Sequence, residues 1–175
     1  MFVTPEDIIS QFHIDPGMSV ADLGSGAGFY SMLVGKVIGP SGRVYAVDVQ
    51  KDLLQKIQSE ATAQGVHNIK LIWGDLDHPR GTTLADASVD RVLIINTLFQ
   101  IENRDGMVTE ALRILKPKGK LLFIDWTDSY GGMGPQPEFV IRPDVARTIF
   151  EHDGFEFDRE LGAGDHHYGF VFKKK

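Results

Sequence analysis

Short runs of β-branched and aromatic residues alternate with longer amphipathic stretches along most of this chain. The alternation is typical of a parallel sheet covered by helices on both faces, because parallel strands need a crossover that a helix supplies. The runs that predict strands span residues 19–23, 43–48, 69–73, 91–95 and 120–125, each bounded by Gly, Pro, Asp or Asn. The predicted fold class is therefore α/β.

Five segments predict helices. Residues 29–38 end at two glycines and a proline, and residues 51–64 carry apolar side chains at helical spacing. A third helix begins at Asn103 or Asp105 and is expected to end at Pro117, and a fourth spans residues 143–152. Residues 5–12 predict a short amphipathic helix that either covers a ligand cleft or packs on the sheet.

The pattern changes after residue 125. Residues 130–137 contain three glycines and two prolines, which predicts an exposed loop that we take as a candidate substrate loop. Residues 155–158 and 168–172 alternate like strands, and the link at 160–166 is too short for a crossover helix. This pair therefore predicts an antiparallel hairpin on an otherwise parallel sheet. We expect one domain over residues 1–175, with a helical cap over 1–13.

Composition excludes several functional classes. With 175 residues and 42% hydrophobic content the chain fits one domain, and its apolar runs are too short to span a membrane. No secretory signal pattern is present, so a cytoplasmic location is expected. The chain has no cysteine, which excludes thiolate chemistry.

The charge gives no clear signal for nucleic-acid binding, because the net charge is −6 and there are only two short lysine clusters, at 116–120 and 173–175. We expect these clusters to be solvated edges of the protein.

A glycine-rich segment at residues 22–28, Asp-Leu-Gly-Ser-Gly-Ala-Gly, stands where the first strand turns into the first helix. Ligands bind at such turns in open α/β sheets, although a tight turn without a ligand is the alternative. A dinucleotide site would have glycine where Phe29 stands. Asp22 would oppose a pyrophosphate but favour a cationic ligand such as S-adenosylmethionine, which carries a sulfonium and an ammonium.

Two further carboxylates follow successive strands. Asp48 ends the second strand and could accept from two ribose hydroxyls. Asp75, in the sequence Gly74-Asp75-Leu76, follows the third strand and could accept from an adenine amine, with Leu76 as an apolar wall. Each aspartate alone could be an ordinary strand-end residue, but three at successive strand ends are much less easily explained as coincidence.

These residues resemble the class I S-adenosylmethionine-dependent methyltransferases, and most closely the ubiquinone/menaquinone-biosynthesis type of small-molecule methyltransferase. The resemblance covers about residues 4–125, and the segments that carry it are 20–28, 47–48, 74–75, 90–92 and 115–121. It implies a Rossmann-like, seven-stranded, mostly parallel sheet with an antiparallel last strand. The family often has glycine where Lys118 stands, a departure expected to lie in an outer turn away from the cofactor.

The resemblance also implies S-adenosyl-L-methionine as cofactor. Asp22 would face its amino group, Gly24 and Gly26 its methionine and ribose parts, Asp48 the ribose hydroxyls and Asp75 the adenine amine. Asn96, just past the fourth strand, would lie beside the methionine end, or would simply terminate the strand. The complete expected cofactor set is Asp22, Gly24, Ser25, Gly26, Gly28, Asp48, Val49, Gly74, Asp75, Leu76 and Asn96.

Methyl transfer is an in-line displacement that needs alignment and exclusion of water rather than a fixed nucleophile, so no catalytic residue is assigned. The substrate side is expected near Asn96, Asp125, Trp126 and Tyr130. His166 could act as a general base, or it and its neighbour could be an exposed loop pair.

A small-molecule methyl acceptor and a monomer or homodimer are expected. No metal site is expected, since His152, His166 and His167 have no recognised ligand spacing. Two alternatives remain: a nicotinamide-dependent oxidoreductase of similar architecture, and a partner subunit that binds S-adenosylmethionine without catalysis.

Overall fold

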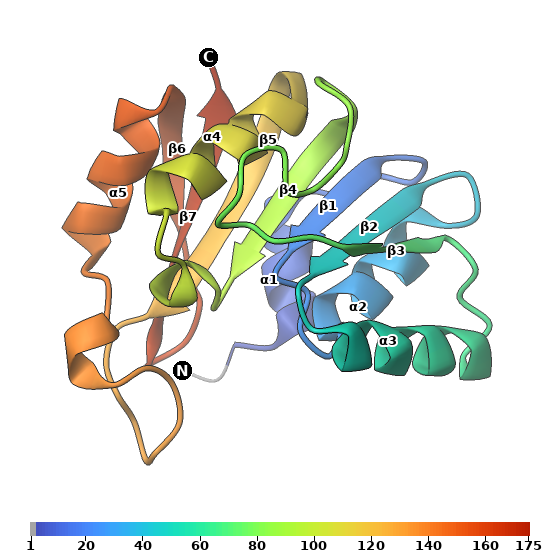
Figure 1. Cartoon of the computed structure of the whole chain (residues 1–175), viewed down its shortest axis with the longest axis horizontal. Coiled ribbons are helices and arrows are strands. Elements are labelled where there is room, and N and C mark those ends of the chain that lie inside the picture. The colour runs from blue at the N-terminus through green and yellow to red at the C-terminus, as the bar shows by residue number, and fades with distance from the viewer. Residues whose placement is uncertain (1–2) are drawn as a thin grey trace.

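The computed structural model describes residues 3–175; residues 1–2 of the expected N-terminal cap lie outside it. At its centre is a seven-stranded sheet in the order β3-β2-β1-β4-β5-β7-β6, with helices on both faces (Figure 1). The strands are β1 (Ser19–Leu23), β2 (Arg43–Asp48), β3 (Ile69–Trp73), β4 (Val89–Ile95), β5 (Leu115–Trp126), β6 (Phe155–Leu161) and β7 (His167–Lys174). Within the described residues, only β7 runs antiparallel to both its neighbours. The predicted α/β fold is confirmed.

The helices are α1 (Pro5–Phe12), α2 (Phe29–Ile38), α3 (Lys51–Ala63), α4 (Arg104–Ile114) and α5 (Pro143–His152), with short 3₁₀ helices η1 (Leu98–Gln100) and η2 (Pro137–Phe139). Apolar side chains of α1 and α2 share one core with one face of the sheet, while those of α4 and α5 pack on the other face. In α1, Ile8, Ile9 and Phe12 are buried, so this helix packs on the sheet. No helix among the described residues is both long and apolar enough to cross a membrane.

The junction of α4 and β5 differs from the sequence expectation. The helix ends at Ile114 rather than at Pro117, and the strand begins at Leu115 rather than at residue 120. The chain passes directly from helix to strand because Leu115 already pairs with Val89 of β4. The register then shifts, so that the next paired residues are Lys120 of β5 and Arg91 of β4. Extra residues at such a bulge need no partner, so the ladder tolerates a proline there.

Lys118 lies within this irregular part of β5 rather than in an outer turn. Its φ of 65° is in the left-handed region, which glycine adopts without strain. This conformation explains why the resembling family often has glycine here. Other strand ends were also predicted short: β4 begins at Val89, and β6 and β7 both extend beyond the expected hairpin strands.

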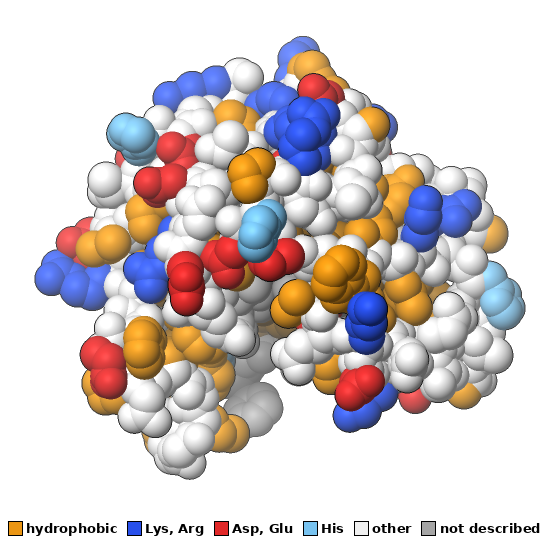
Figure 2. Space-filling model, in the orientation of Figure 1, with side chains coloured by type: hydrophobic (Ala, Val, Ile, Leu, Met, Phe, Trp, Pro, Cys, Tyr) orange, Lys and Arg blue, Asp and Glu red, His pale blue; other side chains and the backbone are white. Residues whose placement is uncertain are grey.

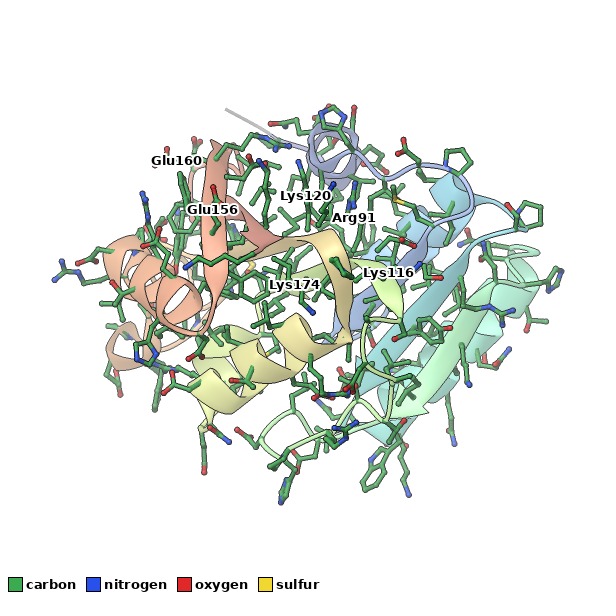
Figure 3. All side chains as sticks on the ribbon, turned by 90° about the horizontal axis from the view of Figure 1, so that it is seen from above. Arg91, Lys116, Lys120, Glu156, Glu160 and Lys174 are labelled. Atoms are coloured by element: carbon green, nitrogen blue, oxygen red, sulfur yellow. The ribbon has the colours of Figure 1, made fainter. Side chains whose placement is uncertain are left out.

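The two lysine clusters come together because β7 is antiparallel to β5, which brings Lys173 opposite Lys120. Figure 3 views the end of the sheet where β4 and β5 begin, with Lys116, Lys120 and Lys174 labelled. Lys120 and Lys173 both pair with Asp158, at 3.2 and 2.7 Å. The ammonium of Lys174 donates to the carbonyls of Leu112 and Leu115, each at 2.7 Å. Most of this positive charge therefore has partners within the protein.

Gly28 generates a stability prediction. It caps α2 at φ 84°, and a Cβ there would lie 2.4 Å from Cγ1 of Ile57 on α3. We expect Gly28→Ala to lower the free energy of unfolding by about 2 to 4 kcal/mol, combining left-handed strain with overpacking. Gly65 is the matched control: its φ is +67° but an added Cβ would meet nothing within 4 Å. Urea unfolding should give Gly65→Ala only about 1 kcal/mol of loss; equal losses would contradict the packing account.

Candidate functional site

Parallel pairing brings the carboxyl ends of β1, β2, β3 and β4 to one edge of the sheet. The segments that follow these strands enclose a cavity of about 390 Å³, within the usual size range of small-ligand sites. Figure 2 shows the molecule notched at this edge, between α3 and the segment that follows β5. Ligand sites of open α/β sheets lie at such an edge, where the strand order reverses between β1 and β4.

All but two of the predicted cofactor residues line this cavity. Those that do are Gly24, Ser25, Gly26, Asp48, Val49, Gly74, Asp75, Leu76 and Asn96. Asp22 and Gly28 do not. Gly28 instead lies in a separate groove between α2 and α3, where its lack of a side chain admits Ile57.

The glycine-rich loop uses its amide groups inside the protein. Gly24 N and Ser25 N donate to the carbonyl of Val47 at 2.9 and 3.0 Å. Gly26 N donates to Asp48 Oδ2 at 2.9 Å. A loop that cradles phosphate presents its amides to the anion. Here these donors are already engaged, so the loop is poorly suited to a pyrophosphate.

Asp48 is held in a defined orientation at the tip of β2. Its Oδ2 accepts from Gly26 N, and its Oδ1 accepts from Gln50 N at 2.8 Å. The residue is only 7% exposed yet lines the cavity. Each carboxylate oxygen can accept more than one hydrogen bond, so capacity remains for two ligand hydroxyls.

Asp75 lies at the tip of β3 and has two local partners. Its Oδ1 accepts from Asp77 N at 3.0 Å, and Nδ1 of His78 lies 2.9 Å from its Oδ2. Leu76 beside it is buried and apolar. An amine donor that reached Asp75 would therefore meet a carboxylate that is already oriented, next to an apolar wall.

Asp22 lies beneath the loop rather than in the cavity. It is buried and accepts a hydrogen bond from Ser31 Oγ at 2.6 Å. Burial raises the pKa of Asp22 to about 6, and the nearby charge of Asp48 acts in the same direction. Asp22 therefore does not line the cavity, and the role toward a ligand amino group that the resemblance implies, directly or through water, stays a prediction.

Two polar atoms in the cavity lack partners. Ser25 Oγ and Asn96 Oδ1 are buried without a hydrogen-bond partner among the described residues. Asn96 also has a φ of 53°, which asparagine tolerates better than most residues. Because a buried polar group without a partner is costly, this pair fits a ligand that brings donors and acceptors, as an amino-acid moiety does.

Sequence reasoning missed about half of the cavity wall. The missed residues are Tyr30, Gln50, Leu53, Asp77, Ile95, Thr97, Gln100 and Ile101. Gln50 and Thr97 each stand close to a predicted residue and could have been found by extending the strand-end rule. Tyr30 and Leu53 lie on helices, and Gln100 belongs to a 3₁₀ helix that no sequence signal indicated.

The expected substrate-side residues form a second group at the same edge, because β7 begins where β5 ends. Trp126 packs against His167 with ring centroids 4.1 Å apart, and Tyr130 stacks on His166 at 3.8 Å. His166 Nδ1 lies 3.1 Å from Asp128 Oδ1. None of Trp126, Tyr130 and His166 lines the 390 Å³ cavity, whereas Asn96 does.

Asn96 connects the two groups, since its backbone N donates to the carbonyl of Ile124 on β5 at 2.8 Å. Asp125, the next residue of β5, is only 1% exposed. Its Oδ1 accepts from Trp126 N at 2.9 Å, while its Oδ2 has no hydrogen-bond partner among residues 3–175. Burial raises the pKa of Asp125 to about 6.

His152 lies at the end of α5, where its Nδ1 is 3.1 Å from Asp153 Oδ1. Within the part of the chain that the structure describes, no three His, Cys, Asp or Glu side chains are grouped so that they could hold a metal ion.

Comparison with known proteins points to one family. A family model described as a methyltransferase domain matches residues 14–137. The arsenite methyltransferase of Halobacterium salinarum is 31% identical over 111 residues, which cover 63% of this chain and 27% of that protein. The ubiquinone/menaquinone biosynthesis C-methyltransferase UbiE of Shewanella pealeana is 27% identical over 149 residues, covering 85% of this chain and 53% of that protein. The chain thus spans about half or less of these curated relatives.

Among solved structures, a SAM dependent methyltransferase from Aquifex aeolicus superposes with a TM-score of 0.87 at 28% identity. The superposition covers 97% of this chain and 88% of that one.

The burial of Asp125 generates a pH prediction. Its folded pKa of about 6 is above the ordinary 3.8, so its stabilising contribution is present below about pH 4 and lost as the pH rises through about 6. Relative to Asp125→Asn, the wild-type protein should lose about 2 to 3 kcal/mol of unfolding free energy between pH 4 and pH 7. Urea unfolding at both pH values tests this, with the exposed Asp52→Asn as control. A pH-independent difference would contradict it.

Proposed function

This chain belongs to the methyltransferase domain family, and from that premise we propose that it transfers a methyl group from S-adenosylmethionine to a small-molecule acceptor. When bound, the cofactor supplies a methyl group on a sulfonium that is suited to in-line displacement. Asp48 would accept from the ribose hydroxyls, and Asp75 with Leu76 would hold the adenine. Ser25 and Asn96 would take the amino-acid end.

The observation that carries this proposal is the hydrogen bonding of the glycine-rich loop. The amides of Gly24, Ser25 and Gly26 all donate to protein acceptors, and the loop lies next to the carboxylates of Asp22 and Asp48. This arrangement favours a nucleoside that bears positive charge over a pyrophosphate. The family match likewise gives no support to a nicotinamide-dependent oxidoreductase.

For the acceptor side we propose Trp126, Tyr130 and His166. In the neutral imidazole, Asp128 next to Nδ1 of His166 selects the tautomer with its proton on Nδ1 and a free lone pair on Nε2. Such a nitrogen could take the proton that an acceptor hydroxyl, amine or thiol loses when it receives the methyl group, with S-adenosylhomocysteine as the leaving group. The stacked ring of Tyr130 would keep the imidazole in place.

Asp48 provides the first test. We expect the wild-type protein to bind S-adenosylhomocysteine in calorimetry, and Asp48→Ala to weaken this binding at least about tenfold, because charge-assisted hydrogen bonds are lost. Asp52→Ala, which removes an exposed carboxylate from α3, should leave the affinity unchanged. No binding by the wild-type protein, or unchanged binding by Asp48→Ala, would refute the proposed site. NADH should not bind.

His166 provides the second test. Small phenols, amines and thiols would be screened for uptake of a radiolabelled methyl group. For an accepted compound, His166→Gln should lower kcat about a hundredfold with little change in cofactor affinity. His152→Gln is the control, since His152 lies on α5 and pairs with Asp153. Cofactor binding without methylation of any compound would favour the non-catalytic partner subunit.

A further inference from the structure

The two outer walls of the cavity are not joined directly by the sheet. One wall is the segment after β3, residues 74–77, and the other is the segment after β4, residues 96–101. In the sheet, β3 is separated from β4 by both β2 and β1. Strand pairing alone therefore leaves the spacing of these walls weakly determined, and side chains must set it.

Asp77 makes this connection. Its Oδ1 accepts from the backbone N of Glu102 and of Asn103, both at 2.8 Å. Its carbonyl accepts from Asn103 Nδ2 at 3.3 Å. Glu102 and Asn103 directly follow Gln100 and Ile101, which line the opposite wall. One residue of the β3 segment thus holds the start of α4 through three hydrogen bonds.

Asp77 also acts on its own wall. Its backbone N donates to Asp75 Oδ1, which orients the carboxylate that lies in the cavity. Asn103 in turn caps α4, since its Oδ1 accepts from Gly106 N at 3.0 Å. The positive end of the helix favours a carboxylate at this position, so the geometry and the electrostatics agree.

We propose that Asp77 is a positioning residue that latches the two walls together and thereby sets how long the nucleoside cofactor stays bound. The inference rests on the proposed function, because it takes S-adenosylhomocysteine as the ligand of this cavity. The side chain of Asp77 acts through the positions of Asp75, Gln100 and Ile101. Once the latch is lost, the walls separate more often and the ligand leaves faster.

The chain offers a matched structural control. Thr82, on the same β3–β4 connection, donates through Oγ1 to Glu110 Oε1 of α4 at 2.5 Å. Both residues are buried, and neither lines the cavity. Thr82→Ala therefore removes a hydrogen bond between the same connection and the same helix, at a place away from the cavity. Its Kd shows how much a general loss of stability changes ligand binding.

The test measures S-adenosylhomocysteine affinity and dissociation for three variants. Asp77→Ala should raise Kd about tenfold, mainly through a faster koff. Asp77→Asn keeps an acceptor oxygen and should stay within about twofold of the wild type. Thr82→Ala should lower the free energy of unfolding but leave Kd unchanged.

Three outcomes would each overturn the latch while leaving the proposed function intact. They are a wild-type Kd for Asp77→Ala, a Kd for Asp77→Asn raised as much as that for Asp77→Ala, and a Kd for Thr82→Ala raised by the same amount. A wild-type protein that does not bind S-adenosylhomocysteine would overturn both. Hydrogen exchange adds a readout without ligand: the amides of Glu102 and Asn103 should lose protection in Asp77→Ala but keep it in Thr82→Ala. Unchanged protection in Asp77→Ala would also overturn the latch.

Discussion

The hydrogen bonds that tie the glycine-rich loop to the end of β2 determine the character of the whole site. Because Val47 O and Asp48 Oδ2 take the amides of Gly24, Ser25 and Gly26, the loop turns its donors inward and offers little to an anion. The same bonds fix Asp48 at the rim of the cavity. The geometry thus suits the proposed cofactor for one reason: carboxylates, not free amides, are the dominant polar groups of the loop and strand ends at this cavity.

The buried carboxylates of Asp22 and Asp125 lower the stability of the folded protein. Asp22 and Asp125 both have a pKa raised to about 6 by burial, and each has few hydrogen-bond donors around it. A core built for stability alone would hold apolar residues at these positions, since unpaired buried charge destabilises the folded state. The orphaned oxygens of Ser25 and Asn96 add to the cost. These buried polar groups with few partners lie at the carboxyl ends of the strands, next to the proposed ligand site. The opposite end of the sheet has paired charges.

The strand-tip residues of the cavity could be predicted because their placement depends on local pattern. A parallel strand must deliver its carboxyl end to one edge, so Asp48 and Asp75 followed from the strand pattern, whereas Asn96 was proposed from the family resemblance. The sequence did not indicate that Asp22 and Gly28 lie outside the cavity lining: the side chain of Asp22 turns under the loop toward Ser31, and Gly28 packs against Ile57 on a different helix. Side-chain direction within a turn and contacts between helices are not encoded in short-range periodicity.

By itself, the sequence determined the α/β class, most element boundaries before residue 103, the antiparallel hairpin and about half of the residues that line the cavity. Hydrophobic period and breaker residues act over a few positions, which is why these features could be predicted. Tertiary structure decided the rest. The strand order puts two strands, β2 and β1, between β3 and β4, which makes Asp77 the link between the segments that follow β3 and β4. The antiparallel direction of β7 brings His166 beside Asp128 and Lys173 beside Lys120. Such pairings join residues far apart in the chain, and only the packed sheet sets their distances.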